Sequence, residues 1–307
     1  DSSHIYFPHI KDNSEAIELA DKITEEMKQF FKAPMKLEFE KIYEKYIILT
    51  KKRYMAKVAN RKGEIIDFTK RGVVLSRRDN MKITRDLYLK TTLSLLDDID
   101  NNIILNDIID GINLMFQRKY SYKEFVITKS LCRGEYKAKT LPAHVQLSER
   151  MKKRGIEVGA GSRIEYIFTT GCRGEKNFNQ GDRVEDIVYF SRMKGYLRVD
   201  FLYYMEKQLI KPLDELIKVG LGIEDFVMNQ YKLRVAKYLL NEKICDIFRP
   251  KITFVDENGN KEEDNNKKNK WVEIKEDKKE DKIKEIKKVN KKSEELKKYK
   301  RKVNNHI

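Results

Sequence analysis

The spacing of the apolar residues changes near residue 80 from one helix and several strand-like runs to mainly helical spacing, and this change sets the fold class. Before it, Asn13 to Phe31 has apolar residues at helical spacing, and Met35 to Val58 is rich in aromatic and branched residues. From Thr84 onward, helical spacing dominates. Strand-like runs followed by helices predict an α+β chain with two parts, residues 1–80 and 81–255.

In the first part, Ser14 is the expected N-cap of the first helix, and Pro34 is expected to end it. Met35 to Val58 is expected to form two strands that meet around Glu44 and Lys45. Two further short strands are predicted at Glu64–Phe68 and Gly72–Ser76.

The second part is expected to be mainly helical with a small sheet. Its helical segments are Leu87–Ile99, Ile103–Gln117, Tyr196–Val219 and Asp225–Phe248. Arg163 to Thr169 alternates apolar and polar residues like a strand. Pro212 lies inside a helical segment and predicts a turn or a kink there.

Residues 256–307 form a charged, low-complexity tail. The segment consists mostly of Lys, Glu, Asp and Asn, with Trp271 as an isolated large apolar group. Such a composition buries too little apolar surface to offset the entropy of ordering, which favours disorder. The alternatives are a solvated single helix over 281–302, or a tether for DNA or a partner.

The chain is strongly basic, with 65 Lys and Arg against 49 Asp and Glu and a net charge of +16. This excess favours a polyanionic partner, with nucleic acid as the leading candidate. A membrane surface is the weaker alternative, because neither a basic amphipathic helix nor an apolar span is found. The three cysteines lack the close spacing of a zinc site. The sequence therefore predicts a soluble, intracellular protein that does not bind membranes.

Two short polar motifs carry the chemistry of the first part. Glu38 and Glu40 are two residues apart, so on a strand both carboxylates would share one face and could approach one cation. Lys52 and Tyr54 follow in the run Lys51 to Tyr54 and would also point together, the ammonium toward a phosphate and the phenol toward phosphate or sugar. The alternative is the charged solvent face of an ordinary hairpin.

The stretch LEFEKIYEKYIILTKKRY, residues 37–54, resembles the segment that family B DNA polymerases carry just after their metal motif, ending in their KKRY signature. The resemblance covers roughly residues 1–250. It implies that residues 1–80 are the end of the polymerase palm and residues 81–255 the thumb. The Lys, Asn and Ile richness and the absence of C-terminal cysteine clusters suggest a viral member.

The resemblance also implies a magnesium site. The family's metal motif reads YGDTDS, and Asp1-Ser2 resembles its last two residues, so upstream residues are expected to have been removed by processing or truncation. Asp1 would then be the second aspartate of that motif and one of the catalytic ligands of the two Mg²⁺ ions, which align the primer 3′ hydroxyl and the triphosphate; another catalytic aspartate is expected upstream. The alternative for Asp1 is a terminal residue without a role. Glu40, and less directly Glu38, would support an additional metal.

The same resemblance assigns DNA-binding residues. Lys52 and Tyr54 resemble the pair that grips the primer strand, and Lys51 and Arg53 add positive charge. The segment Ser76 to Asp79 resembles the family's VRRD motif, in which one arginine would reach DNA and the other pair internally, for example with Asp79. A structural ion-pair role is the alternative for both Arg77 and Arg78. Gly72, in the preceding KG motif, would permit close backbone approach.

Lys139 and His144 belong to a segment that resembles the Y…PHV stretch of the thumb, next to the minor groove of the new duplex. The alternative for His144 is a hydrogen-bonded structural histidine. Tyr203 and Tyr204 lie in a segment that resembles the family's D..YY…Q…PL helix, and their helical spacing favours a role in the core over base stacking.

The intact enzyme is therefore expected to add deoxynucleotides to a primer 3′ end on a DNA template. Its expected partners are primer–template DNA and deoxynucleoside triphosphates, with a processivity factor as a further candidate, acting in the nucleus or at a viral replication site in the cytoplasm. This chain alone is expected to bind DNA without polymerising. The alternatives are a noncatalytic basic nucleic-acid-binding protein, and a scaffold that binds partners through its tail.

Overall fold

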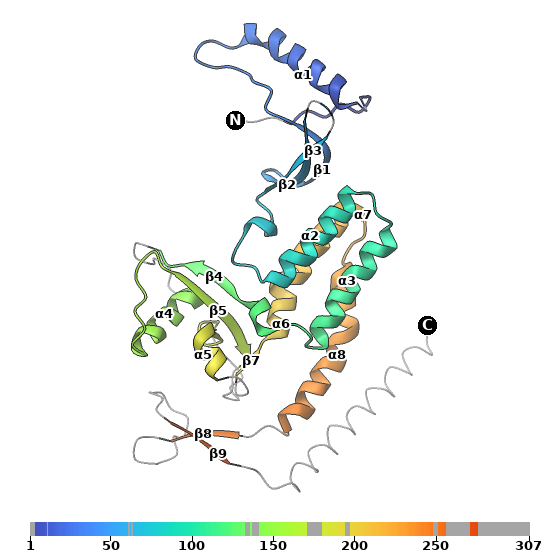
Figure 1. Ribbon diagram of the computed structural model, residues 1–307. Helices are drawn as coiled ribbons and strands as arrows, with labels where there is room; N and C mark the ends of the chain where they lie inside the picture. The colour runs from blue at the N-terminus through green and yellow to red at the C-terminus, as the bar shows by residue number, and fades with distance from the viewer. Residues whose placement is uncertain are drawn as a thin grey trace, which may run out of the picture. The chain divides into compact units, whose positions relative to one another are not determined.

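The computed structural model describes residues 4–10, 12–60, 62, 64–132, 136, 141–170, 180–193, 197–247, 251–255 and 271–275. The chain forms two compact units. The first comprises residues 1–171 and 175–229, and the second residues 172–174 and 230–307. The described residues contain both helices and antiparallel sheets, which confirms the α+β class (Figure 1).

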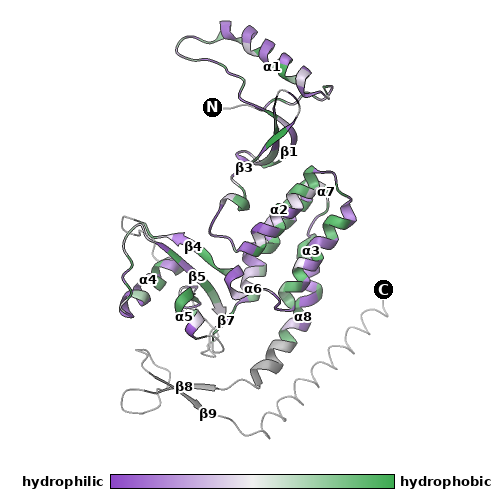
Figure 2. Cartoon of the chain, viewed as in Figure 1, coloured by the Kyte–Doolittle hydropathy of each residue, from purple (hydrophilic) through white to green (hydrophobic). Residues whose placement is uncertain are grey.

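Helix α1 (Asn13–Met27) continues into a 3-10 turn at Lys28–Phe30, which confirms the predicted helix. Its N-cap is Asp12, so the predicted cap Ser14 lies in the first turn instead. Only Ala16 and Ile17 of α1 are buried, and hydrophilic residues recur along the helix (Figure 2). The helix thus contributes little to the core of the first unit.

The first sheet is an antiparallel meander of β1 (Ile42–Thr50), β2 (Arg53–Ala59) and β3 (Ile65–Arg71). The prediction that the first two strands meet at Glu44 and Lys45 is wrong, because β1 runs through both residues. The register shifts between Tyr43 and Lys45, which leaves Glu44 as an extra residue in the ladder. The polar pair therefore marks an irregularity of the strand, and the turn lies at Lys51 and Lys52.

The prediction of a last strand in the first part, at Gly72–Ser76, is also wrong. Val74–Ser76 forms a 3-10 turn. Gly72 has a φ of +62°, which turns the chain out of the extended conformation at the end of β3. The chain then leads into α2 (Lys82–Leu96) and α3 (Asn101–Phe116), the two helices that were expected there.

The core of the first unit lies where these helices meet the strands. Helix α3 buries Ile104, Ile108, Ile112 and Met115 on one face. On α2, the hydroxyl of Thr92 lies 3.4 Å from the sulfur of the fully buried Met55 on β2. Strand β1 also contacts α7 (Ile210–Leu221). The first sheet is thereby packed against α2 and α7.

A second antiparallel sheet follows in the sequence. Its strands are β4 (Ile127–Ser130), β5 (Arg163–Thr170), β6 (Val184–Asp186) and β7 (Arg198–Val199). Strand β5 was predicted, and it pairs with each of the other three. A 3-10 turn (Tyr122–Phe125) precedes the sheet, and α4 (Ala143–Lys153) and α5 (Ile187–Arg192) contact β5 and β6.

The predicted helix around Pro212 is continuous but changes its winding. Helix α6 (Phe201–Tyr204) passes through a π-helical turn (Met205–Leu209) into α7. Pro212 has no N–H to donate to the carbonyl of Gln208, which accounts for the wider turn before it. Tyr204 is fully buried and accepts a hydrogen bond from the Phe168 N–H at 2.9 Å, which confirms its predicted place in the core.

Helix α8 (Phe226–Ile247) begins in the first unit, where Asp214 accepts hydrogen bonds from the N–H groups of Val227 (2.7 Å) and Met228 (3.2 Å).

In the second unit, β8 (Lys251–Val255) pairs antiparallel with β9 (Trp271–Lys275). Strand β9 lies inside the segment expected to lack regular structure. Its Trp271, Val272 and Ile274 are apolar enough to support a strand. The helix suggested over 281–302 lies outside the described residues.

Candidate nucleic-acid interface

The tip of the first hairpin presents two lysines. Thr50 pairs with Arg53, so Lys51 and Lys52 form a two-residue turn, and both are exposed. Lys52 has a φ of +63°, in the left-handed region. Because Lys52 lies in the turn, the expectation that it points with Tyr54 as on a strand is wrong. The turn instead carries two adjacent ammonium groups.

Gly72 contacts the backbone of this turn, which confirms the predicted close approach. A Cβ built on Gly72 would overlap the carbonyl oxygen of Lys52 and lie 3.1 Å from Cγ of Arg53. Both the positive φ and the short contact require glycine here. The end of β3 therefore supports the Lys51–Lys52 turn through backbone atoms.

Arg53 forms a two-point ion pair with Glu215 on α7. Its Nη1 and Nη2 each lie 2.6 Å from one of the two carboxylate oxygens. The side chains are about one-third exposed, 36% for Arg53 and 33% for Glu215. The hydrogen bonds to Glu215 raise the pKa of Arg53 above its ordinary value, so the guanidinium stays charged. The charge of Arg53 is therefore balanced within the protein by Glu215.

Tyr54 belongs to a cluster of four rings at the side of the hairpin. Its ring centroid lies 5.0 Å from that of His4 and 5.3 Å from that of Tyr46, and Tyr46 Oη lies 2.8 Å from His4 Nδ1. Burial and a hydrogen bond with Tyr54 raise the pKa of Tyr43, so this phenol stays protonated. The cluster holds the segment around His4 against the same hairpin.

Glu38 and Glu40 precede β1 on irregular backbone, so the strand geometry predicted for them is wrong. Glu40 lies 3.1 Å from Lys41 Nζ and Glu38 lies 3.4 Å from Lys36 Nζ, and both carboxylates are almost three-quarters exposed. Within the described ranges, no group of three or more His, Cys, Asp or Glu side chains could hold a metal ion. These two carboxylates therefore do not fit a metal site by themselves, and Asp1 lies outside the described residues.

The two adjacent arginines after β3 differ in their contacts. Arg77 donates to both carboxylate oxygens of Asp79, at 3.0 and 2.8 Å, and this pair lowers the pKa of Asp79. The predicted internal pair is confirmed for Arg77. Arg78 is exposed and has no carboxylate partner among the residues that the structure describes.

Arg78 lines an open hollow of about 380 Å³ together with residues of the second sheet. Three cations border it, Arg78, Lys129 on β4 and Arg163 on β5. Lys129 Nζ lies 4.0 Å from Asp79, whose charge Arg77 already balances, and Arg163 is exposed. The hollow thus has an excess of positive charge that suits an anion. Sequence reasoning missed Lys129, because a single lysine on a short strand gives no signal.

His144, at the start of α4, also lines this hollow but is buried, with 8% of its surface exposed. Burial, and then the charge of Lys129, lower its pKa, while a backbone hydrogen bond with Ser130 opposes the shift. Its ring stacks on Tyr166 with the ring centroids 6.4 Å apart. These contacts favour the structural histidine that was one of the two expectations. Lys139, predicted beside it, lies outside the described residues.

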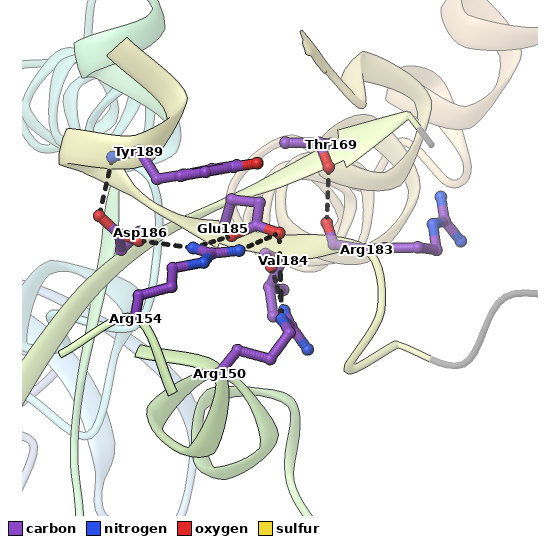
Figure 3. Close-up of polar contacts among 8 residues, drawn as sticks. All are labelled: Arg150, Arg154, Thr169, Arg183, Val184, Glu185, Asp186 and Tyr189. Carbon is purple, nitrogen blue, oxygen red and sulfur yellow. Dashed lines mark hydrogen bonds and ion pairs between the residues drawn. The ribbon is translucent and has the colours of Figure 1, made fainter. Parts of the chain in front are cut away.

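Two arginines at the C-terminal end of α4 are held by groups of β6 (Figure 3). Arg154, the C-cap of α4, lies 3.0 Å from Glu185 and 3.2 Å from Asp186, and its guanidinium lies 3.8 Å from the centroid of the Tyr189 ring. Arg150 donates to the carbonyl of Val184 at 2.5 Å. These contacts attach α4 to β6, and they distinguish structural arginines from the exposed cations of the hollow.

Two places of the first unit group cations close together, the Lys51–Lys52 turn and the hollow bordered by Arg78, Lys129 and Arg163. The turn offers two ammonium groups, and the hollow offers one ammonium and two guanidinium groups, which are the groups that contact phosphate backbones. None of the helices in the described part of the chain is long and apolar enough to cross a membrane. These features define a candidate nucleic-acid-binding protein.

Comparison with known proteins identifies the family. Residues 1–219 match the model of DNA polymerase family B, to which this chain therefore belongs. DNA polymerase 120R of Invertebrate iridescent virus 3 is 32% identical over 304 residues, covering 81% of this chain and 26% of that protein. The DNA polymerase delta catalytic subunit of Candida albicans is 32% identical over 220 residues, covering 69% of this chain and 20% of the subunit.

Among solved structures, the family B DNA polymerase from the hyperthermophilic archaeon Pyrobaculum calidifontis is similar, with a TM-score of 0.45 and 18% identity. The match covers 66% of this chain and 24% of that one. The chain spans between a fifth and about a quarter of the length of the curated relatives named above, 20% and 26%.

Proposed function

We propose that this chain holds the primer–template duplex of a DNA polymerase through its phosphate backbone. The observation that carries the proposal is the hollow in which Arg78 and Arg163 are exposed and Lys129 adds a third charge. The Lys51–Lys52 turn would add two contacts to the primer strand. Phosphate contacts of this kind bind DNA without reading its sequence, as template-directed synthesis requires.

We further propose that the intact protein adds deoxynucleotides to a primer 3′ end. Membership of a polymerase family, with relatives named as DNA polymerases, favours this function over a noncatalytic nucleic-acid-binding protein. Asp1 is the candidate ligand for magnesium, which when bound would stabilise the charge that develops on the transferred phosphate. Residues 1–80 would then belong to the palm and 81–255 to the thumb.

The double variant Arg78→Ala/Arg163→Ala tests the role of the hollow. We expect its dissociation constant for a primer–template duplex to rise by about 10- to 100-fold at 0.1 M salt, because two phosphate contacts are lost. Fluorescence anisotropy with a labelled duplex measures this directly. As a control, Arg77→Ala removes a cation that Asp79 already balances, and its affinity should change by less than about threefold. Equal losses in both variants would contradict a specific role for the hollow.

A further inference from the structure

The Arg53–Glu215 ion pair joins the turn of the hairpin to a helix that is distant in the sequence. Arg53 is the first residue of β2, directly after Lys52, and Glu215 lies 162 residues further along the chain on α7. Both hydrogen bonds measure 2.6 Å, the short distance of a charge-assisted, two-point contact. Such a contact restrains the direction as well as the position of the arginine.

The surroundings of the pair are those of a fixed support. Tyr88 on α2 is 1% exposed, and its hydroxyl lies near enough to both Arg53 and Glu215 for their charges to act on its pKa. Gly72 packs against the carbonyl of Lys52 and lies next to the Arg53 side chain. The left-handed Lys52 is thus held by a backbone contact with Gly72 and by the ion pair of the residue that follows it.

Charge balance argues against Arg53 as a direct phosphate contact. Its two outer nitrogen atoms both donate to Glu215, so a phosphate would have to compete with a carboxylate that is already bound. Lys51 and Lys52, in contrast, are exposed and have no ion-pair partner among the described residues. The two lysines that can reach DNA therefore directly precede an arginine that is occupied by Glu215.

We propose that Arg53 is a positioning residue, whose ion pair with Glu215 holds the Lys51–Lys52 turn in the conformation that binds DNA phosphates. This inference rests on the proposed DNA-binding function. It makes α7 part of the binding machinery although Glu215 is negatively charged and would repel DNA. Loss of the Glu215 charge should weaken DNA binding if the ion pair positions the turn, and should strengthen it if only charge repulsion matters. The inference is therefore testable.

Glu215→Gln is the decisive variant, because it makes the protein more basic while it weakens the ion pair. A positioning role predicts that affinity for a primer–template duplex falls by about 3- to 30-fold, within the range of coupling between contacting groups. A role of Arg53 as a phosphate contact predicts tighter binding, since Arg53 would be released. Glu224→Gln is the matched control, because Glu224 pairs with Lys218 at an exposed site and loses the same charge.

The experiment uses the 307-residue chain, anisotropy with a labelled duplex, and circular dichroism to verify the fold. Lys52→Ala should weaken the wild type but have less than about a twofold effect when combined with Glu215→Gln, because the turn is already displaced. Arg53→Lys keeps the charge, loses the two-point contact and should weaken binding with the fold intact.

Equal or tighter binding by Glu215→Gln than by Glu224→Gln, or an undiminished effect of Lys52→Ala in the Glu215→Gln background, would overturn the positioning role and leave the DNA-binding function standing. If the wild-type chain itself does not bind the duplex, both proposals fall. If Glu215→Gln does not fold, the affinity of Arg53→Lys for the duplex decides instead. Weaker binding by this variant would support the positioning role, and wild-type affinity would overturn it.

Discussion

The double variant Lys51→Ala/Lys52→Ala should bind a primer–template duplex about 10- to 100-fold more weakly than the wild type at 0.1 M salt. Each lysine that neutralises a phosphate releases counterions, so the slope of log affinity against log salt should become shallower by about 1.8, or 0.9 per contact. Both side chains are exposed, and alanine has the same Cβ as lysine at the left-handed position 52, so stability should change little. Anisotropy titrations at several salt concentrations measure both effects.

The matched control is Lys82→Ala/Lys218→Ala, which removes the same formal charge. Lys82 Nζ lies 2.9 Å from Glu124 and Lys218 Nζ lies 2.6 Å from Glu224, so the charges of both lysines are already balanced at exposed sites. This control should keep affinity within about threefold of the wild type. If the two double variants lose affinity equally, the effect comes from net charge alone and the turn has no specific role.

Gly72→Ala should destabilise the protein by roughly 2–5 kcal/mol, the second large effect that we expect. The substitution places a Cβ on a residue with a φ of +62° and against the carbonyl oxygen of Lys52, so both backbone strain and overlap oppose it. Urea unfolding followed by circular dichroism measures the change. The displaced turn should also weaken duplex binding.

Gly155→Ala separates the two contributions to this loss. Gly155 also has a positive φ, +80°, but a Cβ built there meets no atom within 4 Å. The Gly155→Ala variant should therefore lose only about 1–2 kcal/mol of its free energy of unfolding, from backbone strain, and should keep its affinity for DNA. Equal destabilisation by the two substitutions would show that the contact between Gly72 and Lys52 contributes nothing to stability.

The fold could be predicted where a single pattern extends over many residues. Helices α1, α2 and α3 and strand β5 follow from apolar spacing alone. The hairpin itself was predicted, but its turn was misplaced, because Glu44 and Lys45 interrupt the apolar run as a turn would. In the structure a register shift accommodates Glu44 within β1, and Lys45 pairs with Lys57. The actual turn contains no Gly, Asn or Pro, since Lys51 and Lys52 form it with the support of Gly72.

The candidate site was predictable only where the resemblance to family B polymerases reached it. Lys51, Lys52 and Arg78 came from motif matches, and the structure leaves them exposed. The partner of Arg53 could not be inferred, because a contact across 162 residues depends on how α7 packs against the hairpin. Lys129 becomes a candidate only when β4 and β5 pair and bring it beside Arg163.

The most direct test of the account is the affinity of the 307-residue chain for a primer–template duplex as a function of salt. Five cations at the turn and the hollow, the exposed Lys51, Lys52, Arg78 and Arg163 and the half-buried Lys129, predict a log–log slope of about −4.5, at 0.9 per phosphate contact. A slope between about −3 and −6, with similar affinity for duplexes of unrelated sequence, would support backbone binding by these residues. Absence of duplex binding at low salt, or an affinity independent of salt, would contradict it.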